Sequence, residues 1–131
     1  MRQTERQRRG KSAEELVAAR LKVEGWMLLG VNLRVGRDEV DVLALEPGPP
    51  LTVVVVEVRS LRARAFGAPE ERVDGNKVRR LYRAASALRG QRLVTADGIR
   101  LAGLPWRVDL IVVDARDGAP RLRHLRALEP P

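Results

Sequence analysis

Two apolar segments carry charged residues at spacings that suggest chemistry. The segment EVDVLAL contains Glu39 and Asp41, and the segment LTVVVVEVRS places Glu57 and Arg59 after four consecutive valines. Removing a carboxylate from water is costly unless the carboxylate is paired or coordinates a metal ion. The charges at the end of this apolar run are therefore either a structural ion pair or part of a functional site.

Strand geometry brings these charges together. Side chains alternate between the two faces of a strand, so Glu39 and Asp41 share a face. Glu57 and Arg59 share a face for the same reason. If the segment EPGPP joins neighbouring strands, the two pairs meet near one end of a sheet, and Glu14 from a preceding helix can add a further carboxylate.

Clustered carboxylates predict a divalent cation. Closely placed carboxylates repel one another, and a divalent ion is the common physical remedy. The chain has no cysteine and a single histidine, so oxygen ligands favour Mg²⁺ or Mn²⁺ over zinc. The acids available for such an ion are Glu14, Glu39, Asp41 and Glu57.

The chain also contains elements that can position these acids. Helical spacing predicts a first helix over residues 12–24, ending at Gly25, and a second helix over residues 76–89. Strand patterns recur in five segments, residues 26–35, 39–45, 51–60, 106–114 and 120–128. The third strand is predicted to be central because its apolar run is continuous. This order predicts an α/β fold, a mixed sheet of about five strands flanked by helices.

Length and charge restrict the class of partner. We expect a flexible basic start at residues 1–9 and a single domain over residues 10–131. The 25 basic residues against 17 acidic ones, a net charge of +8, make nucleic acid the first candidate. A GC-rich genome or a thermophilic host would produce the same balance without any binding surface. No apolar run approaches the roughly 18 residues of a membrane span, so we expect a cytoplasmic protein with no membrane partner.

The second predicted helix carries a candidate nucleic-acid contact. Its apolar stripe leaves the remaining surface to four cations, Lys77, Arg79, Arg80 and Arg83. Such a surface is either simply solvated or contacts phosphates beside the acids, and the sequence leaves both possibilities open. Aromatic residues make up only 3% of the chain, which argues against a base-stacking platform for single strands.

An ordered set of short motifs resembles one known family. The set begins with Gly10, Glu14, Leu21, Gly25 and Asn32 and continues with DEVDVLAL, VVEVRS, FGAP, Lys77 and WRVDLIVV. In this order and spacing it resembles the YraN-type predicted endonucleases, small members of the PD-(D/E)XK or restriction-endonuclease-like superfamily. The resemblance extends from Gly10 to about Asp114.

The resemblance implies a role for each matching residue. Asp41 is the first acid of the motif, Glu57 the second, and Arg59 stands at the position of the motif's lysine. Glu14 matches the helix acid of related Holliday-junction resolvases, and Glu39 matches a family glutamate that is a further ligand or lies beside the ligands. The family implies Mg²⁺- or Mn²⁺-dependent hydrolysis of DNA, including branched, flap or junction DNA, and related resolvases suggest a homodimer.

Departures from the family pattern favour a second hypothesis. Arg59 stays protonated at any workable pH and cannot act as a general base, although it can donate hydrogen bonds to a phosphate. Asp38 replaces a usual glycine, and Leu61 stands where the family often has a basic residue. The alternative is therefore a nucleic-acid-binding or scaffold protein that keeps the nuclease fold without the reaction.

A few further residues carry weaker expectations. Asp109 has either a structural role or a place near the site, and Phe66 with Gly67 matches a family loop of undetermined role. His124 is expected on the surface of an edge strand. The three aromatic residues expected to pack in the core are Trp26, Tyr82 and Trp106.

Overall fold

A computed structural model of the chain describes residues 5–61 and 74–130, with side chains from residue 13 onward. The elements in chain order are α1 (Glu5–Val23), β1 (Met27–Val35), β2 (Asp38–Glu46), β3 (Thr52–Leu61), α2 (Gly75–Gly90), a short 3₁₀ helix (Leu101–Gly103), β4 (Trp106–Asp114) and β5 (Arg121–Leu125). All five predicted strands and both predicted helices are therefore present.

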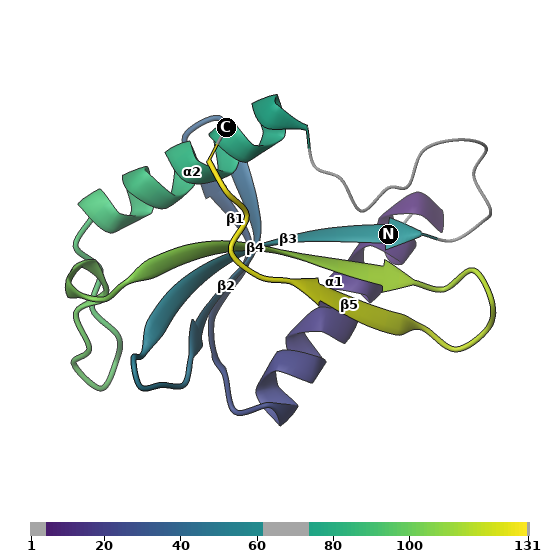
Figure 1. The fold of residues 1–131 in the computed structure, drawn as a ribbon, viewed down its shortest axis with the longest axis horizontal. Helices are drawn as coiled ribbons and strands as arrows, with labels where there is room; N and C mark the ends of the chain where they lie inside the picture. Colours follow the sequence, from purple (N-terminus) through teal and green to yellow (C-terminus); the bar gives the residue numbers. More distant parts are fainter. Residues whose placement is uncertain (1–4, 62–73, 131) are drawn as a thin grey trace.

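The strands form one mixed sheet in the order β1-β2-β3-β4-β5. Neighbours are antiparallel except β3 and β4, which run parallel because the connection between them contains α2. Figure 1 shows α2 above the sheet and α1 below it. The predicted α/β class, a sheet flanked by helices as in restriction-endonuclease-like folds, is confirmed.

The central strand β3 explains how one sheet holds both helices. Its four valines are fully buried and alternate between two apolar clusters. Val53 and Val55 pack in the cluster that contains Leu81 of α2. Val54 and Val56 pack in the cluster of α1, whose buried members are Ala13, Val17 and Leu21. Because both faces are covered, the strand reads as a continuous apolar run.

The first helix differs from its prediction at one end. It ends as expected before Gly25, whose φ of +91° is the left-handed conformation that glycine adopts most easily. It begins at Glu5 rather than at Ser12, so residues 5–9 are helical where a flexible start was expected. The physical reason is that glutamate, glutamine and arginine, which fill this segment, are strong helix formers. Residues 1–4 lie outside the described part.

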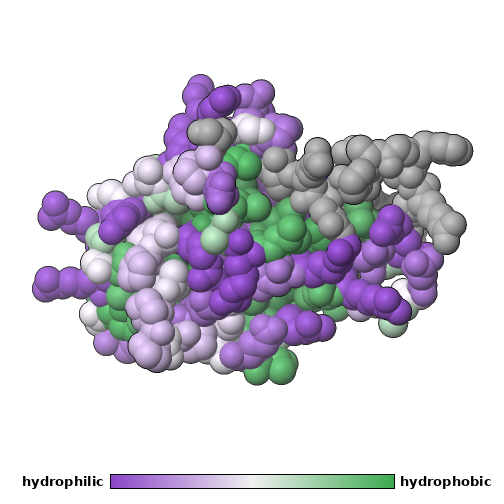
Figure 2. Space-filling model, in the orientation of Figure 1, coloured by the Kyte–Doolittle hydropathy of each residue, from purple (hydrophilic) through white to green (hydrophobic). Residues whose placement is uncertain are grey.

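The aromatic residues pack largely as expected. Trp26 is buried in the cluster of α1, whereas Tyr82 and Trp106 are half-buried against the cluster of α2. Hydrophilic side chains gather over the outer side of α2, at the top of the view in Figure 2. Among the described helices, none is both long enough and apolar enough to cross a membrane.

Candidate active site

The acid site forms where β2 and β3 separate. Their antiparallel ladder ends at the pair Val42 and Val56, and the next position along it sets Asp41 opposite Glu57. Beyond this point the backbone amide of Val58 donates a 2.8 Å hydrogen bond to Asp41 Oδ2 rather than to a carbonyl of β2. The Asp41 carboxylate thus satisfies a backbone amide of the neighbouring strand and is held beside the second acid.

Glu57 is the most perturbed acid of the site. Its residue is only 7% exposed, and its buried Oε2 atom lies 3.0 Å from the ammonium group of Lys77. Burial, followed by the Asp41 carboxyl, raises the pKa of Glu57 from 4.5 to about 8, although Lys77 opposes the change. At neutral pH the Glu57 carboxyl is therefore protonated most of the time, unless a divalent cation binds beside it.

The cation at Glu57 comes from α2. Lys77 Nζ lies 3.0 Å from Glu57 Oε2. Asp74 caps the helix by accepting a 2.9 Å hydrogen bond from the backbone amide of Lys77. The sequence had suggested Lys77 only as a nucleic-acid contact, because its pairing with Glu57 depends on how α2 docks onto the sheet.

Glu14 and Glu39 lie at the border of this pair. Burial, followed by the nearby Asp41 and Glu39 carboxyls, raises the pKa of Glu14. A hydrogen bond with the side chain of Asn32 lowers this pKa and only partly offsets the increase. Asn32 has a φ of +53° within β1, and its role beside Glu14 was not foreseen from the sequence beyond its match to the family. Glu39 is exposed and stands opposite Arg34 of β1.

The number and spacing of the acids decide which kind of metal ion they can hold. Within residues 13–61 and 74–130, no three histidine, aspartate or glutamate side chains gather closely enough to enclose an ion. Asp41 and Glu57 are a pair of adjacent carboxyl groups, and Lys77 lies 3.0 Å from one oxygen of Glu57. Mg²⁺ commonly takes one or two carboxylates from a protein and completes its shell with water and substrate phosphates. The pair therefore fits Mg²⁺ or Mn²⁺ bound together with a phosphate.

Arg59 lies two positions beyond Glu57 on β3. It stands opposite Val112 in the parallel ladder and is half-buried. Residues two apart on a strand share a face, so a fixed positive charge stands next to the acids at the position of the motif's lysine. Leu61, where the family often has a basic residue, is buried against Leu110 and Val112.

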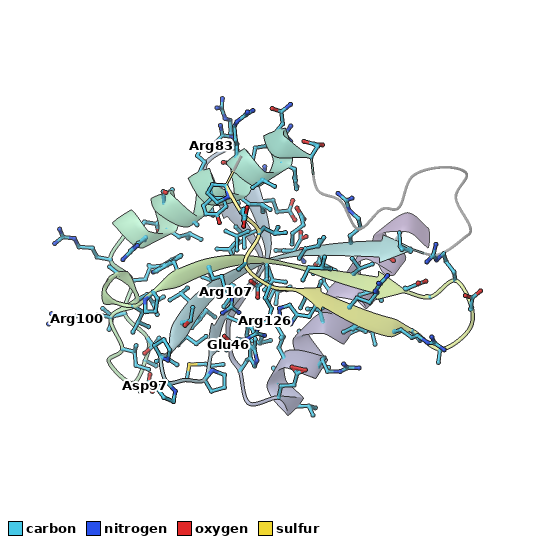
Figure 3. All side chains as sticks on the ribbon, viewed as in Figure 1. Glu46, Arg83, Asp97, Arg100, Arg107 and Arg126 are labelled. Atoms are coloured by element: carbon cyan, nitrogen blue, oxygen red, sulfur yellow. The ribbon has the colours of Figure 1, made fainter. Side chains whose placement is uncertain are left out.

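Asp38 does not join the acids. Arg83 of α2 donates two hydrogen bonds to its carboxylate, 2.8 Å to Oδ2 and 2.7 Å to Oδ1, and this pairing holds the pKa of Asp38 below its usual range. Figure 3 shows Arg83 on the outer side of α2. Asp38, which was not expected at this position, thus links the start of β2 to α2. It also neutralises Arg83, one of the four cations predicted on the surface of α2.

The other predicted cations of α2 line a basic hollow on the surface. A depression of about 490 Å³ is lined by Arg37, Asp38, Asn76, Arg79, Arg80 and Arg83. Arg79 donates a 2.8 Å hydrogen bond to Asn76 there. A second depression of about 200 Å³ shares Arg37 and Arg80 with the first and reaches Lys77 and Glu39. The hollow therefore leads from the turn after β1 to the cation of the acid pair.

Asp109 belongs to a separate buried network. It stands opposite Val56, on the face covered by α1, whereas Glu57 stands opposite Leu110. It accepts hydrogen bonds of 2.8 and 2.9 Å from Arg107 and one of 2.9 Å from the backbone amide of Ala127. Burial raises its pKa, but these bonds and His124 outweigh burial and hold the pKa below the usual range. These contacts are those of a structural hydrogen-bond role, one of the two alternatives expected for it.

His124 is not the surface residue that was expected. Its Nε2 atom lies 2.7 Å from Asp109 Oδ2, and its ring packs against Trp26 with centroids 5.7 Å apart. Strand β5 is an edge strand, but its antiparallel pairing turns this side chain onto the sheet. Glu46 extends the network by pairing with Arg107 and Arg126, and Figure 3 shows these three side chains together. The predicted loop residues Phe66 and Gly67 lie outside the described residues.

Comparisons with known proteins cover the whole candidate site. A family model described as "Uncharacterised protein family UPF0102" matches residues 13–113. A UPF0102 protein of Pseudomonas aeruginosa (strain LESB58) is 40% identical over 116 residues, 87% of this chain and 86% of the relative. UPF0102 proteins of Arthrobacter sp. (strain FB24) and Bacteroides thetaiotaomicron are 34% and 33% identical, each over at least 91% of this chain and 93% of the relative. These names state no activity, substrate or ligand.

Proposed function

Since the chain belongs to the uncharacterised protein family UPF0102, the YraN family, whose name assigns no activity, we propose from its site that it is a metal-dependent nuclease that hydrolyses phosphodiester bonds in DNA. The observation that carries the proposal is the pair Asp41 and Glu57, two carboxyl groups placed side by side where two strands separate, of which Glu57 is buried. Two carboxylates brought together in this way repel each other, and a bound divalent ion relieves the repulsion.

Each residue of the site has a separate role in the proposed reaction. Asp41 and Glu57 would hold Mg²⁺ or Mn²⁺, which when bound polarises the scissile phosphate and favours hydroxide as the nucleophile. Arg59 and Lys77 stabilise the negative charge that develops on the phosphate, and Arg59 does so without exchanging a proton. Glu14 and Glu39 are further acids at the border of the site.

The basic hollow supplies the contact with the nucleic-acid backbone. Arg37, Arg79 and Arg80 line it, and its second part reaches Lys77. Phosphate contacts of this kind position a nucleic acid without reading its sequence. We expect the protein to act in the cytoplasm on branched, flap or junction DNA, as a homodimer that places two sites on one substrate.

Cleavage assays test the proposal directly. Junction, flap, nicked and linear DNA substrates are incubated with the protein in Mg²⁺, in Mn²⁺ and in EDTA. We expect cleavage that requires metal and is lost in Asp41→Asn and in Glu57→Gln. Asp117→Asn, the same charge change in the exposed turn after β4, should cleave like the wild type. Absence of cleavage on every substrate, or cleavage indifferent to Asp41 and Glu57, contradicts the proposal.

One observation favours a second function. No three acids gather into a metal cage among the described residues, and the motif's lysine is an arginine. A nucleic-acid-binding protein of this fold that performs no hydrolysis would have the same features. It would bind DNA with a steep salt dependence that survives Asp41→Asn and Glu57→Gln, and Mn²⁺ would not raise its melting temperature.

A further inference from the structure

Lys77 connects the two parts of the proposed site. Its ammonium group lies 3.0 Å from Glu57 Oε2, and 36% of its side chain is exposed. It also lines the 200 Å³ depression together with Arg37 and Arg80. One flexible cation therefore stands between the buried acid pair and the surface proposed to bind phosphates.

The ammonium group lies beside an oxygen that a metal ion would use. Because it is 3.0 Å from Glu57 Oε2, its positive charge stabilises the carboxylate of Glu57. A divalent ion bound to Asp41 and Glu57 would share this oxygen, and two cations at such a distance repel each other strongly in a partly buried site. Metal binding therefore requires the ammonium group to move.

A nucleic-acid phosphate offers the ammonium group another partner. The lysine stem has four carbons and rotates freely, and its head is a compact donor that suits a phosphate as well as a carboxylate. A phosphate held by Arg37 and Arg80 lies within the same depression that Lys77 lines. Mg²⁺ in such sites also takes phosphate oxygens as ligands. Both effects favour metal binding once nucleic acid is present.

We propose that Lys77 is an exchangeable counter-cation that makes metal and nucleic acid bind cooperatively. Without nucleic acid it stays beside Glu57 and competes with the divalent ion. With nucleic acid it transfers to a phosphate and leaves the carboxylate to the metal. This inference rests on the proposed metal site and adds the regulation of that site, which would restrict metal loading to protein already bound to substrate.

Equilibrium titrations with Mn²⁺ test the exchange without requiring activity. Free Mn²⁺ is measured by electron paramagnetic resonance for the wild type and for Lys77→Met, each with and without a short mixed-sequence DNA duplex, and a titration of DNA alone is subtracted. The matched control is Arg89→Met, which removes an exposed cation in the last turn of α2 that donates a hydrogen bond to the carbonyl of Ala102. Lys77→Gln serves as a second variant, and melting curves establish that each variant is folded.

The expected pattern is specific. Without DNA, Lys77→Met should bind Mn²⁺ about 5- to 20-fold more tightly than the wild type, within the usual range of coupling between sites. The duplex should tighten Mn²⁺ binding by a similar factor in the wild type and by less than about twofold in Lys77→Met. By reciprocity, Mn²⁺ should raise the affinity of the wild type for the duplex to the same extent. Arg89→Met should behave like the wild type in its response.

Each other outcome overturns the exchange, and the outcomes separate it from the proposed function. If the wild type binds Mn²⁺ through Glu57 but Lys77→Met and Lys77→Gln bind it equally or more weakly, Lys77 does not compete and the nuclease proposal stands. If neither the wild type nor the variants bind Mn²⁺ with or without DNA, both the exchange and the proposed metal site are wrong.

Discussion

At the scale of single residues, Glu57 has the most strongly raised pKa among the described carboxyl groups. Its pKa is about 8 in the fold against 4.5 for an ordinary glutamate. The folded chain therefore binds more protons than the unfolded chain between these values. The stability that Glu57 contributes is complete below about pH 4.5 and is lost as the pH rises through about 8. The same site that suits a metal ion is thus a source of instability at high pH.

Glu57→Gln should remove this loss, because glutamine keeps the shape of a protonated carboxyl and cannot ionise. Above about pH 8 we expect the variant to be more stable than the wild type by about 1–3 kcal/mol, with the difference vanishing below about pH 4.5. Urea denaturation across this pH range measures it, with the exposed Glu24→Gln as the control. A wild type whose free energy of unfolding does not fall with pH relative to Glu57→Gln would contradict the assignment.

Arg59 allows a second prediction at this scale. Lysine at this position could give up a proton, whereas arginine cannot. If the arginine limits the reaction, Arg59→Lys should increase Mg²⁺-dependent cleavage by about 100-fold, the low end of what proton transfer contributes. Single-turnover cleavage measures the change, and Arg92→Lys on an exposed loop is the control. Unchanged or reduced cleavage would show that the fixed charge is required as it is.

At the scale of elements, α2 distributes its cations between two tasks. Arg83 is committed to Asp38 through two hydrogen bonds, and Lys77 is paired with Glu57. Arg80 has neither partner and lines both depressions. The helix therefore presents less free positive charge than its sequence suggests, and the cations differ in their expected effect on binding.

Salt titrations should resolve this difference. Arg80→Ala is expected to lower the slope of log K against log salt concentration for duplex binding by about 1. Arg83→Ala, the same charge change on the same helix, should alter the slope less, because Asp38 already neutralises that guanidinium. Fluorescence anisotropy at several salt concentrations measures both slopes. Equal effects of the two substitutions would mean that the pair with Asp38 opens when DNA binds.

The elements themselves were largely predictable, and their contacts were predictable only in part. The unbroken apolar run before Glu57 identified β3 as central, and the short EPGPP connection indicated that Asp41 would meet Glu57. The pairing of Lys77 with Glu57 was missed because it depends on the docking of α2. His124 was misjudged because an edge strand usually exposes its charges, and its partner Asp109 is distant in sequence.

At the scale of the whole molecule, the network around Asp109 holds the C-terminal segment to the sheet. Asp109 binds the backbone of Ala127, and the backbone amide of Leu128 donates to the carbonyl of Val108 at 2.7 Å. The Tyr82 hydroxyl donates to the carbonyl of Leu128. The chain end is thereby linked both to β4 and to α2.

Loss of Asp109 should therefore affect stability and leave the site intact. Asp109→Ala leaves Arg107 without its buried partner, and we expect a loss of about 3 kcal/mol in the free energy of unfolding. Asp114→Ala, which breaks a solvent-screened ion pair with Arg116 at the other end of β4, should cost far less. Urea denaturation measures both. A folded Asp109→Ala protein with altered Mn²⁺ affinity would place Asp109 in the functional site after all.

The parallel pairing of β3 with β4 also bears on how the chain folds. The strands β1, β2 and β3 follow one another through short connections, whereas Val53 meets Trp106 only after the whole crossover has closed. Closing a long loop loses conformational entropy before the contacts between its ends can stabilise the chain. Local hairpins therefore form most readily. The two acids face each other within such a hairpin. Lys77 arrives with the crossover, so the acid pair is a local feature of the chain and its counter-ion is a product of the complete fold.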